Sequence, residues 1–184
     1  MKNKLMLLVA TLAITTSAAT AAPKTSGVES TSDKQVVKQV RHELVTLPYY
    51  GVFDNLGYKV EGTTVTLFGQ VTRPTTRHDA GRRVAKIAGV QQVVNNIKVL
   101  PLSSFDDSIR ARTYRAVFRS GSLYRYAMGA NPSIHIIVDR GHVTLEGVVG
   151  SKMDRQLAYI AANGVFGTFS VTNNLRTEND SEAY

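Results

Sequence analysis

The chain has 184 residues, no cysteine and a formal net charge of +8. The lack of cysteine excludes disulfide bonds and a lipid anchor on a cysteine, so any folded unit depends on its hydrophobic core. The positive charge favours contact with anionic surfaces such as phospholipid headgroups, polyanionic glycans or acidic proteins, although a moderate excess also serves solubility alone.

The N-terminal segment predicts an export signal over residues 1–21. Lys2 and Lys4 precede a short apolar stretch, and small residues follow at 17–22. Cleavage after Ala21 satisfies the small-x-small rule, and cleavage after Ala19 is the alternative. A retained membrane anchor is a further alternative, but the apolar stretch is short for a bilayer. We therefore expect an exported protein without a transmembrane segment in its mature form, for which encounters with nucleic acid are rare.

Residues 22–32 are rich in small and polar side chains and predict a flexible leader. Ser32 or Asp33 is the expected cap of a first helix, which ends before Pro48. Alternating apolar residues then predict a hairpin whose second strand covers 65–71. A helix follows from Pro74 with Gly89 as its expected left-handed cap, and a strand over 93–99 closes the unit.

A segment of this unit recurs later in the chain. Val65-Thr66-Leu67-x-Gly69-x-Val71 returns without a gap as Val143-Thr144-Leu145-x-Gly147-x-Val149, and 11 of the 35 positions from 65 to 99 are identical in the second copy. Such repetition indicates one supersecondary unit used twice. At Gly69 and Gly147 we expect the missing side chain to let neighbouring backbone come close.

The second copy begins after a short linker over 102–105. Asp106 or Asp107 is the expected cap of its first helix, and about five additional residues around 126–132 precede its hairpin. Residues 178–184 predict a disordered tail. The expected fold class is α+β, with two domains over 33–101 and 106–177. Each is a small three-stranded sheet with two helices packed on one face.

The order helix, strand, strand, helix, strand, together with the Val-Thr-Leu-x-Gly-x-Val strand and the closing Val-x-Asn-x-Ile/Leu strand, resembles the BON domain, named after bacterial OsmY and nodulation. Two such domains behind an export signal are similar to OsmY-like, stress-associated periplasmic proteins of Gram-negative bacteria. The resemblance implies phospholipid binding and envelope integrity, or chaperone-like support of exported proteins, and no catalytic site.

The residues themselves indicate no enzyme and no cofactor. The four histidines form no HxxxH or HExxH pattern, and without cysteine a zinc site has no ligand set. The chain also lacks a Gly-x-Ser-x-Gly elbow and a glycine-rich phosphate loop. Helix capping explains the adjacent Asp106 and Asp107.

The candidate interaction surface is the first helix of the second copy and the loop after it, where arginines alternate with aromatic residues. Its members are Arg110, Arg112, Tyr114, Arg115, Phe118, Arg119, Tyr124, Arg125 and Tyr126. Arginine offers a planar donor fork for phosphate, and aromatic rings suit a headgroup boundary. The alternative is that the rings pack under the sheet or between the domains and that the arginines form a solvated helix face.

The favoured function is therefore peripheral binding of anionic phospholipid in support of the envelope under stress. The alternative is a protein-interaction or chaperone-like module that contacts envelope proteins without lipid binding. A glycan-binding role through stacked tyrosines remains a third hypothesis.

Overall fold

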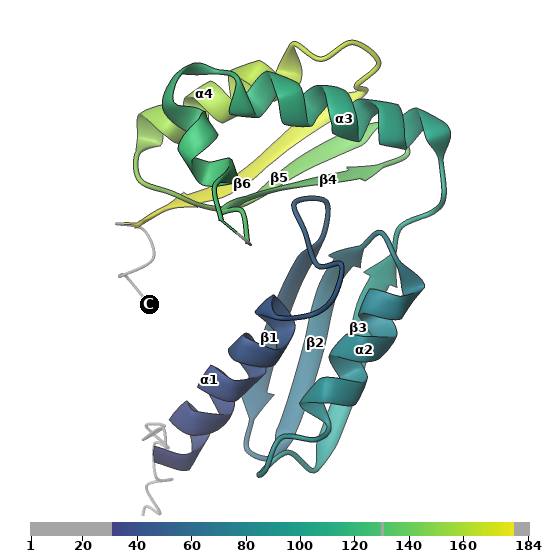
Figure 1. Cartoon of the computed structure of the whole chain (residues 1–184), viewed down its shortest axis with the longest axis vertical. Helices are drawn as coiled ribbons and strands as arrows, with labels where there is room; N and C mark the ends of the chain where they lie inside the picture. Colours follow the sequence, from purple (N-terminus) through teal and green to yellow (C-terminus); the bar gives the residue numbers. More distant parts are fainter. Residues whose placement is uncertain (1–30, 130, 179–184) are drawn as a thin grey trace, which may run out of the picture.

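The computed structural model describes residues 31–129 and 131–178, which form two domains of the same fold (Figure 1). The predicted export signal, residues 22–30 of the predicted leader and residues 179–184 of the predicted tail lie outside the described residues. Residues 31 and 32, predicted as leader, belong to the first helix.

The first domain is a three-stranded sheet with both helices on one face (Figure 1). Its strand order is β1-β2-β3, with β1 antiparallel and β3 parallel to β2. The elements are α1 (Thr31–Val45), β1 (Asn55–Glu61), β2 (Thr64–Val71), α2 (Pro74–Val84) and β3 (Gln92–Val99).

The second domain repeats this topology, with the order β4-β5-β6. The predicted α+β class is thus confirmed in both halves. A short 3-10 helix lies between the first helix of the second copy and its hairpin. The elements are α3 (Ser104–Phe118), η1 (Gly121–Ala127), β4 (Ile134–Asp139), β5 (His142–Val149), α4 (Lys152–Asn163) and β6 (Ser170–Thr177).

The glycines shared by the two copies have the predicted role. Gly69 and Gly147 have φ angles of 119° and 121°, which side-chain-bearing residues rarely adopt. A β-carbon at Gly69 would collide with the carbonyl oxygen of Asn55, and one at Gly147 with that of Ser133. The close approach of neighbouring backbone therefore explains both residues.

Three local predictions were wrong. Ser32 and Asp33 lie within α1, which includes Thr31, so neither is its N-terminal cap. Ser103, and neither Asp106 nor Asp107, caps α3, because its hydroxyl accepts a hydrogen bond from the Asp106 N–H. The Asp106 carboxylate instead accepts from the N–H groups of Arg140 and Gly141 and holds the second hairpin turn. Gly89 does not cap α2, which ends at Val84; the glycine has its positive φ in the turn that leads to β3.

The loop between α1 and β1 docks the first domain onto the second. Val52 and Phe53 pack against the core of the second domain. The carbonyl oxygen of Val52 accepts a hydrogen bond from the Ile136 N–H of edge strand β4 at 2.7 Å. Burial lowers the pKa of His135, whose ring lies beside Tyr50 and contacts the carbonyl oxygen of Gly51. The first domain thus completes the packing of the second.

The repeated asparagines fasten each closing strand to the second helix of its copy. Asn173 donates to the carbonyl oxygen of Arg155 at 3.0 Å and accepts from the Leu175 N–H at 3.2 Å. We expect Asn173→Ala to lower the free energy of unfolding by about 1.5 kcal/mol, because two partly buried hydrogen bonds are lost. Urea titration measures this. Asn174→Ala is the control, since Asn174 is exposed, and an equal loss there would contradict the assignment.

Candidate functional site

The outward side of α3 carries a stripe of arginines. Ile109, Thr113 and Val117 point into the core, so the opposite side of the helix faces solvent. Arg112, Arg115 and Arg119 occur at helical spacing on this outer side, with Arg115 and Arg119 exposed and Arg112 half-buried. α3 therefore presents three guanidinium groups along one line.

Helix α4 lies beside α3 on the same side of the sheet (Figure 1), and α4 and the loop after it carry exposed apolar side chains. α4 buries Ala158 and Ala162 and leaves its opposite side in solvent. Three phenylalanines lie where the end of α4 meets the start of α3, and the rings of Phe105 and Phe169 are 5.9 Å apart. The exposed fractions are 75% for Met153, 58% for Ile160, 87% for Phe166, 69% for Phe169 and 45% for Phe105.

We call this surface the two-helix face. It consists of Arg112, Arg115 and Arg119 with Phe105, Met153, Ile160, Phe166 and Phe169. Several large apolar side chains that solvent reaches on one surface are unusual for a free-standing domain, and such patches mark interaction sites.

The first domain shows that the fold does not require this surface. At the positions equivalent to Met153, Ile160, Phe166 and Phe169, the first copy has Thr75, Arg82, Ala88 and Gln91. α1 and α3 both have 15 residues, and at the positions of the three arginines the first helix has Gln39, His42 and Thr46. The apolar side chains and the three arginine positions are thus specific to the second copy, whereas the first copy carries Arg82 in place of Ile160.

The structure divides the nine residues predicted for the interaction surface. Three of them are buried: Arg110 is 5% exposed, Phe118 7% and Tyr126 9%. Arg112, Arg115 and Arg119 belong to the two-helix face. Tyr114 lies toward the first domain, where its ring packs between Phe53 and Phe118 at centroid distances of 6.2 and 4.8 Å. Tyr124 is exposed in η1.

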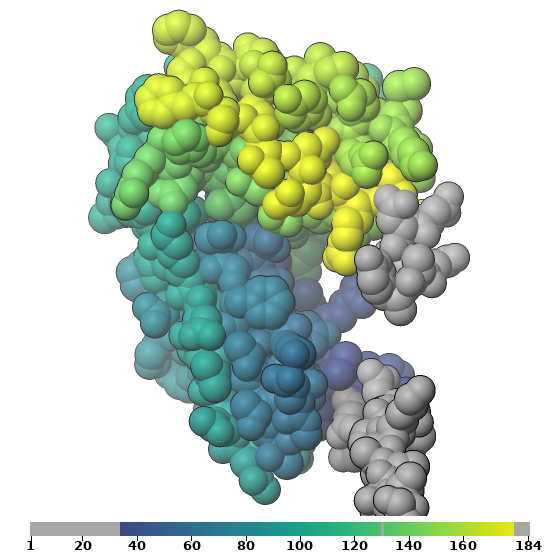
Figure 2. Space-filling model, turned by 180° about the vertical axis from the view of Figure 1, so that it is seen from behind, coloured from purple at the N-terminus to yellow at the C-terminus, as the bar shows by residue number. Residues whose placement is uncertain are grey.

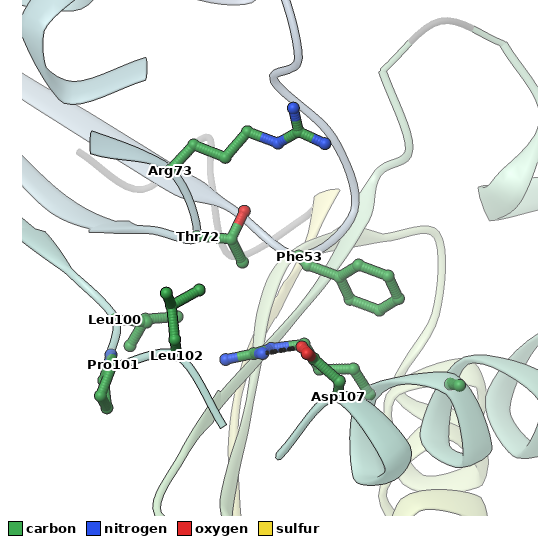
Figure 3. A pocket seen from close by; sticks show the side chains of 9 residues that line it. Phe53, Thr72, Arg73, Leu100, Pro101, Leu102 and Asp107 are labelled. Carbon is green, nitrogen blue, oxygen red and sulfur yellow. Dashed lines mark hydrogen bonds and ion pairs between the residues drawn. The ribbon is translucent and has the colours of Figure 1, made fainter. Parts of the chain in front are cut away.

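Arg110 has a structural environment. Its guanidinium group pairs with Asp107 and donates to the carbonyl oxygen of Val138 at 2.7 Å. It borders a cavity of about 380 Å³ between the domains, into which Phe53 also faces (Figure 3). Because the guanidinium group of Arg110 is buried and already bound to Asp107 and Val138, it is unsuited to bind an external phosphate.

Arg125 and Tyr126 belong to a network around buried Asp154. The carboxylate accepts from Ser151 Oγ at 2.7 Å, from the Tyr126 hydroxyl at 2.9 Å and from Arg125 Nη2 at 2.6 Å. Burial raises the pKa of Asp154, but these donors and Ser122 together outweigh it and hold the pKa below the usual value. The network fastens η1 to the start of α4.

The apolar half of the two-helix face was missed by the sequence reasoning. Phe105 was assigned to the linker, and Phe166 and Phe169 flank a glycine in a loop. The alignment of the two copies contained a signal, because Ala88 and Gln91 of the first copy correspond to phenylalanines in the second.

The described residues contain no group of three or more metal-ligating side chains that could hold a metal ion. No helix within 31–129 or 131–178 is long and apolar enough to cross a membrane.

Comparison with known proteins agrees with this geometry. The BON domain model matches residues 32–101 and 106–179, well over half of the chain. The chain belongs to the BON domain family. Its two BON domains coincide with the two structural units, and BON domains are associated with interaction with membranes and phospholipids.

A search of curated proteins found no significant match. Among solved structures, the chain is similar to CdsD, a structural protein of the type III secretion system of Chlamydia trachomatis. The identity is 9% over 80% of this chain and 95% of that chain, with a TM-score of 0.31. The C-terminal domain of CdsD gives 9% identity, coverage of 76% and 96%, and a TM-score of 0.28. Scores this low support no inference about function.

Proposed function

We propose that this tandem BON-domain protein is a non-enzymatic periplasmic protein that binds anionic phospholipid surfaces peripherally and so supports the envelope under stress. The two-helix face carries the proposal, because it combines exposed apolar side chains with arginines, and the equivalent surface of the first domain has no large apolar side chain at the matching positions. The predicted export signal supports the location.

The two kinds of side chain on the face have complementary roles at a bilayer. Each arginine near an anionic surface contributes about 1 kcal/mol at modest salt. Burying a phenylalanine ring contributes roughly 1.5–3 kcal/mol. Three arginines with two or three inserted rings therefore give reversible binding, and Arg115 and Arg119, which are exposed, reach headgroup phosphates without rearrangement.

Vesicle flotation tests the proposal with the chain from residue 22 onward. We expect binding to vesicles of phosphatidylcholine mixed with phosphatidylglycerol, weaker binding to pure phosphatidylcholine, and release as salt rises. The double variant Phe166→Ser/Phe169→Ser should bind at least about 10-fold more weakly. Arg115→Glu/Arg119→Glu should show a loss of similar size on anionic vesicles only.

The first domain offers matched controls. Ala88→Ser/Gln91→Ser changes the positions that correspond to Phe166 and Phe169, and Arg82→Glu removes an exposed positive charge from α2. All three substitutions should leave binding within about twofold, since these positions lie outside the two-helix face. Equal binding of all variants, or equal binding to neutral and anionic vesicles, would refute the proposal.

A further inference from the structure

Strand β1 is an edge of the first sheet, and its free side borders a cleft between the two domains. Figure 2 shows the domains in contact along one side and hollowed between them along the other. A cavity of about 580 Å³ lies toward α1 and includes Arg41 and Val45 in its wall. A second, of about 570 Å³, lies toward Phe68. Both share Leu56, Tyr58 and Arg176.

The backbone of β1 alternates in the direction of its hydrogen-bonding groups. Glu61 pairs with Thr64 across a two-residue turn, so this pair is directly hydrogen-bonded, as is every second pair before it. The groups of Leu56, Tyr58 and Val60 therefore point away from β2. The Tyr50 hydroxyl accepts a hydrogen bond from the N–H of Leu56, so this outward group already has a partner. Burial raises the pKa of Tyr50 to about 12, and the hydroxyl therefore stays protonated. No strand of the described residues pairs with the outward groups of Tyr58 and Val60.

The second domain shows how the same edge is closed. On β4 the outward N–H of Ile136 donates to the carbonyl oxygen of Val52, in an extended loop of this chain, and the outward carbonyl of Val138 accepts from Arg110. The corresponding groups of β1, at the equivalent positions of the first copy, are the N–H of Tyr58 and the carbonyl of Val60.

The first domain lacks both of these partners. In the alignment of the two 15-residue helices, α1 has Val37 at the position of Arg110, and valine has no donor to offer. The loop that covers β4 comes from the first domain, and the described residues contain no counterpart that covers β1. The edge of β1 thus has the same outward groups as β4 without the segment that closes them.

The side chains around β1 indicate what kind of segment fits. Phe68 is 47% exposed and lies over Gly57, where a β-carbon would collide with its ring, so an aromatic platform flanks one side of the strand. On the other side Tyr58 and Val45 offer apolar surface. Arg41 and Arg176 line the cleft, and neither forms an ion pair with a carboxylate in the described parts of the chain. Apolar and acidic residues in alternation complement this surface.

We propose that the edge of β1 binds an extended peptide segment of alternating apolar and acidic residues, which adds to the first sheet as a fourth strand. Backbone hydrogen bonds to Tyr58 and Val60 provide affinity, and contacts with Phe68 and Arg41 select the sequence.

Fluorescence anisotropy tests this with the chain from residue 22 onward and a labelled eight-residue peptide in which valine or phenylalanine alternates with glutamate. Val60→Pro removes an outward N–H without breaking a bond to β2, and should weaken binding at least about fivefold. Arg41→Glu should also weaken binding, by about fivefold. Lys86→Glu, the same charge change on an exposed residue outside the cleft, should leave it unchanged.

A peptide with alternate backbone nitrogens methylated keeps the side chains but cannot pair as a strand. Its failure to bind supports strand addition, whereas binding equal to that of the parent peptide overturns it. Circular dichroism confirms that Val60→Pro is folded, and Phe68→Ser tests the same site without a backbone change. Light scattering tests for self-association through the same edge. If the natural chain is a dimer, Val60→Pro is a monomer and neither binds the peptide, the edge pairs with a second copy and the proposal fails.

Discussion

Asp154→Asn should lower the free energy of unfolding by about 3 kcal/mol. The substitution keeps the shape of the side chain but places an amide among the donors from Ser151, Tyr126 and Arg125. Because Asp154 and Tyr126 are both buried, the Tyr126 hydroxyl cannot turn to water, and breaking such a buried network typically costs several kcal/mol. Urea denaturation followed by circular dichroism measures the loss.

The first domain again provides the control. Thr76 occupies the position equivalent to Asp154 in the first copy, and its buried hydroxyl has no hydrogen-bond partner among the described residues. Thr76→Val should therefore change stability by less than about 1 kcal/mol and in the stabilising direction. If both substitutions lowered the free energy of unfolding by the same amount, the network around Asp154 would make no specific contribution to stability.

The same carboxylate makes stability depend on pH. Its pKa in the folded protein is lower than the ordinary value of 3.8, which applies to the unfolded chain. The contribution of Asp154 is therefore complete above pH 3.8 and declines as the pH falls through the folded pKa. The stability difference between the natural chain and Asp154→Asn should persist at neutral pH and shrink below this point. A constant difference down to pH 2 would contradict the lowered pKa.

Phe53→Ala should lower the free energy of unfolding by about 2–3 kcal/mol and loosen the two domains from each other. The ring of Phe53 comes from the first domain but packs against the core of the second, 6.2 Å from the ring of Tyr114. Removing the ring leaves a void beside Tyr114 of α3 and breaks the contact between the two rings. Calorimetry should resolve two transitions in the variant where the natural chain gives one.

Phe166→Ala is the matched control for this change. Phe166 is 87% exposed, so its loss should alter stability by no more than about 0.5 kcal/mol while it weakens vesicle binding. The two substitutions thus separate packing from binding. A single unaltered transition in Phe53→Ala would mean that the loop contributes little to domain docking.

The fold was predictable because local and long-range signals agree. Apolar residues at helical spacing, such as Val36, Val40 and Leu44, all lie in the first core. The repeated Gly69 and Gly147 marked equivalent strands, and the structure gives both the same backbone conformation. Helix ends were less predictable, because the hydroxyl of Ser103 and the carboxylates after it are all suitable caps and only the folded geometry selects one.

The candidate site was predictable only in its charged half. Arg112, Arg115 and Arg119 are at helical spacing and outside the core, but Arg110 shares its helix side with Ile109 and Thr113 and is buried. Aromatic residues at the ends of elements were harder to place. Phe118 is buried and Phe166 is exposed. This difference depends on which surfaces the other domain and the neighbouring helix cover, and the local sequence does not encode that.

The docking of Val52 on β4 also sets how the two-helix face and the free edge of β1 are oriented relative to each other. The two-helix face lies on the side of the second sheet away from the first domain, whereas the free edge of β1 opens into the cleft on the opposite side of that sheet (Figure 1). A molecule resting on a bilayer by its arginines and phenylalanines would hold its first domain upright and clear of the lipid. In this orientation the second domain contacts the lipid, while the edge of β1 stays accessible to a peptide from the side.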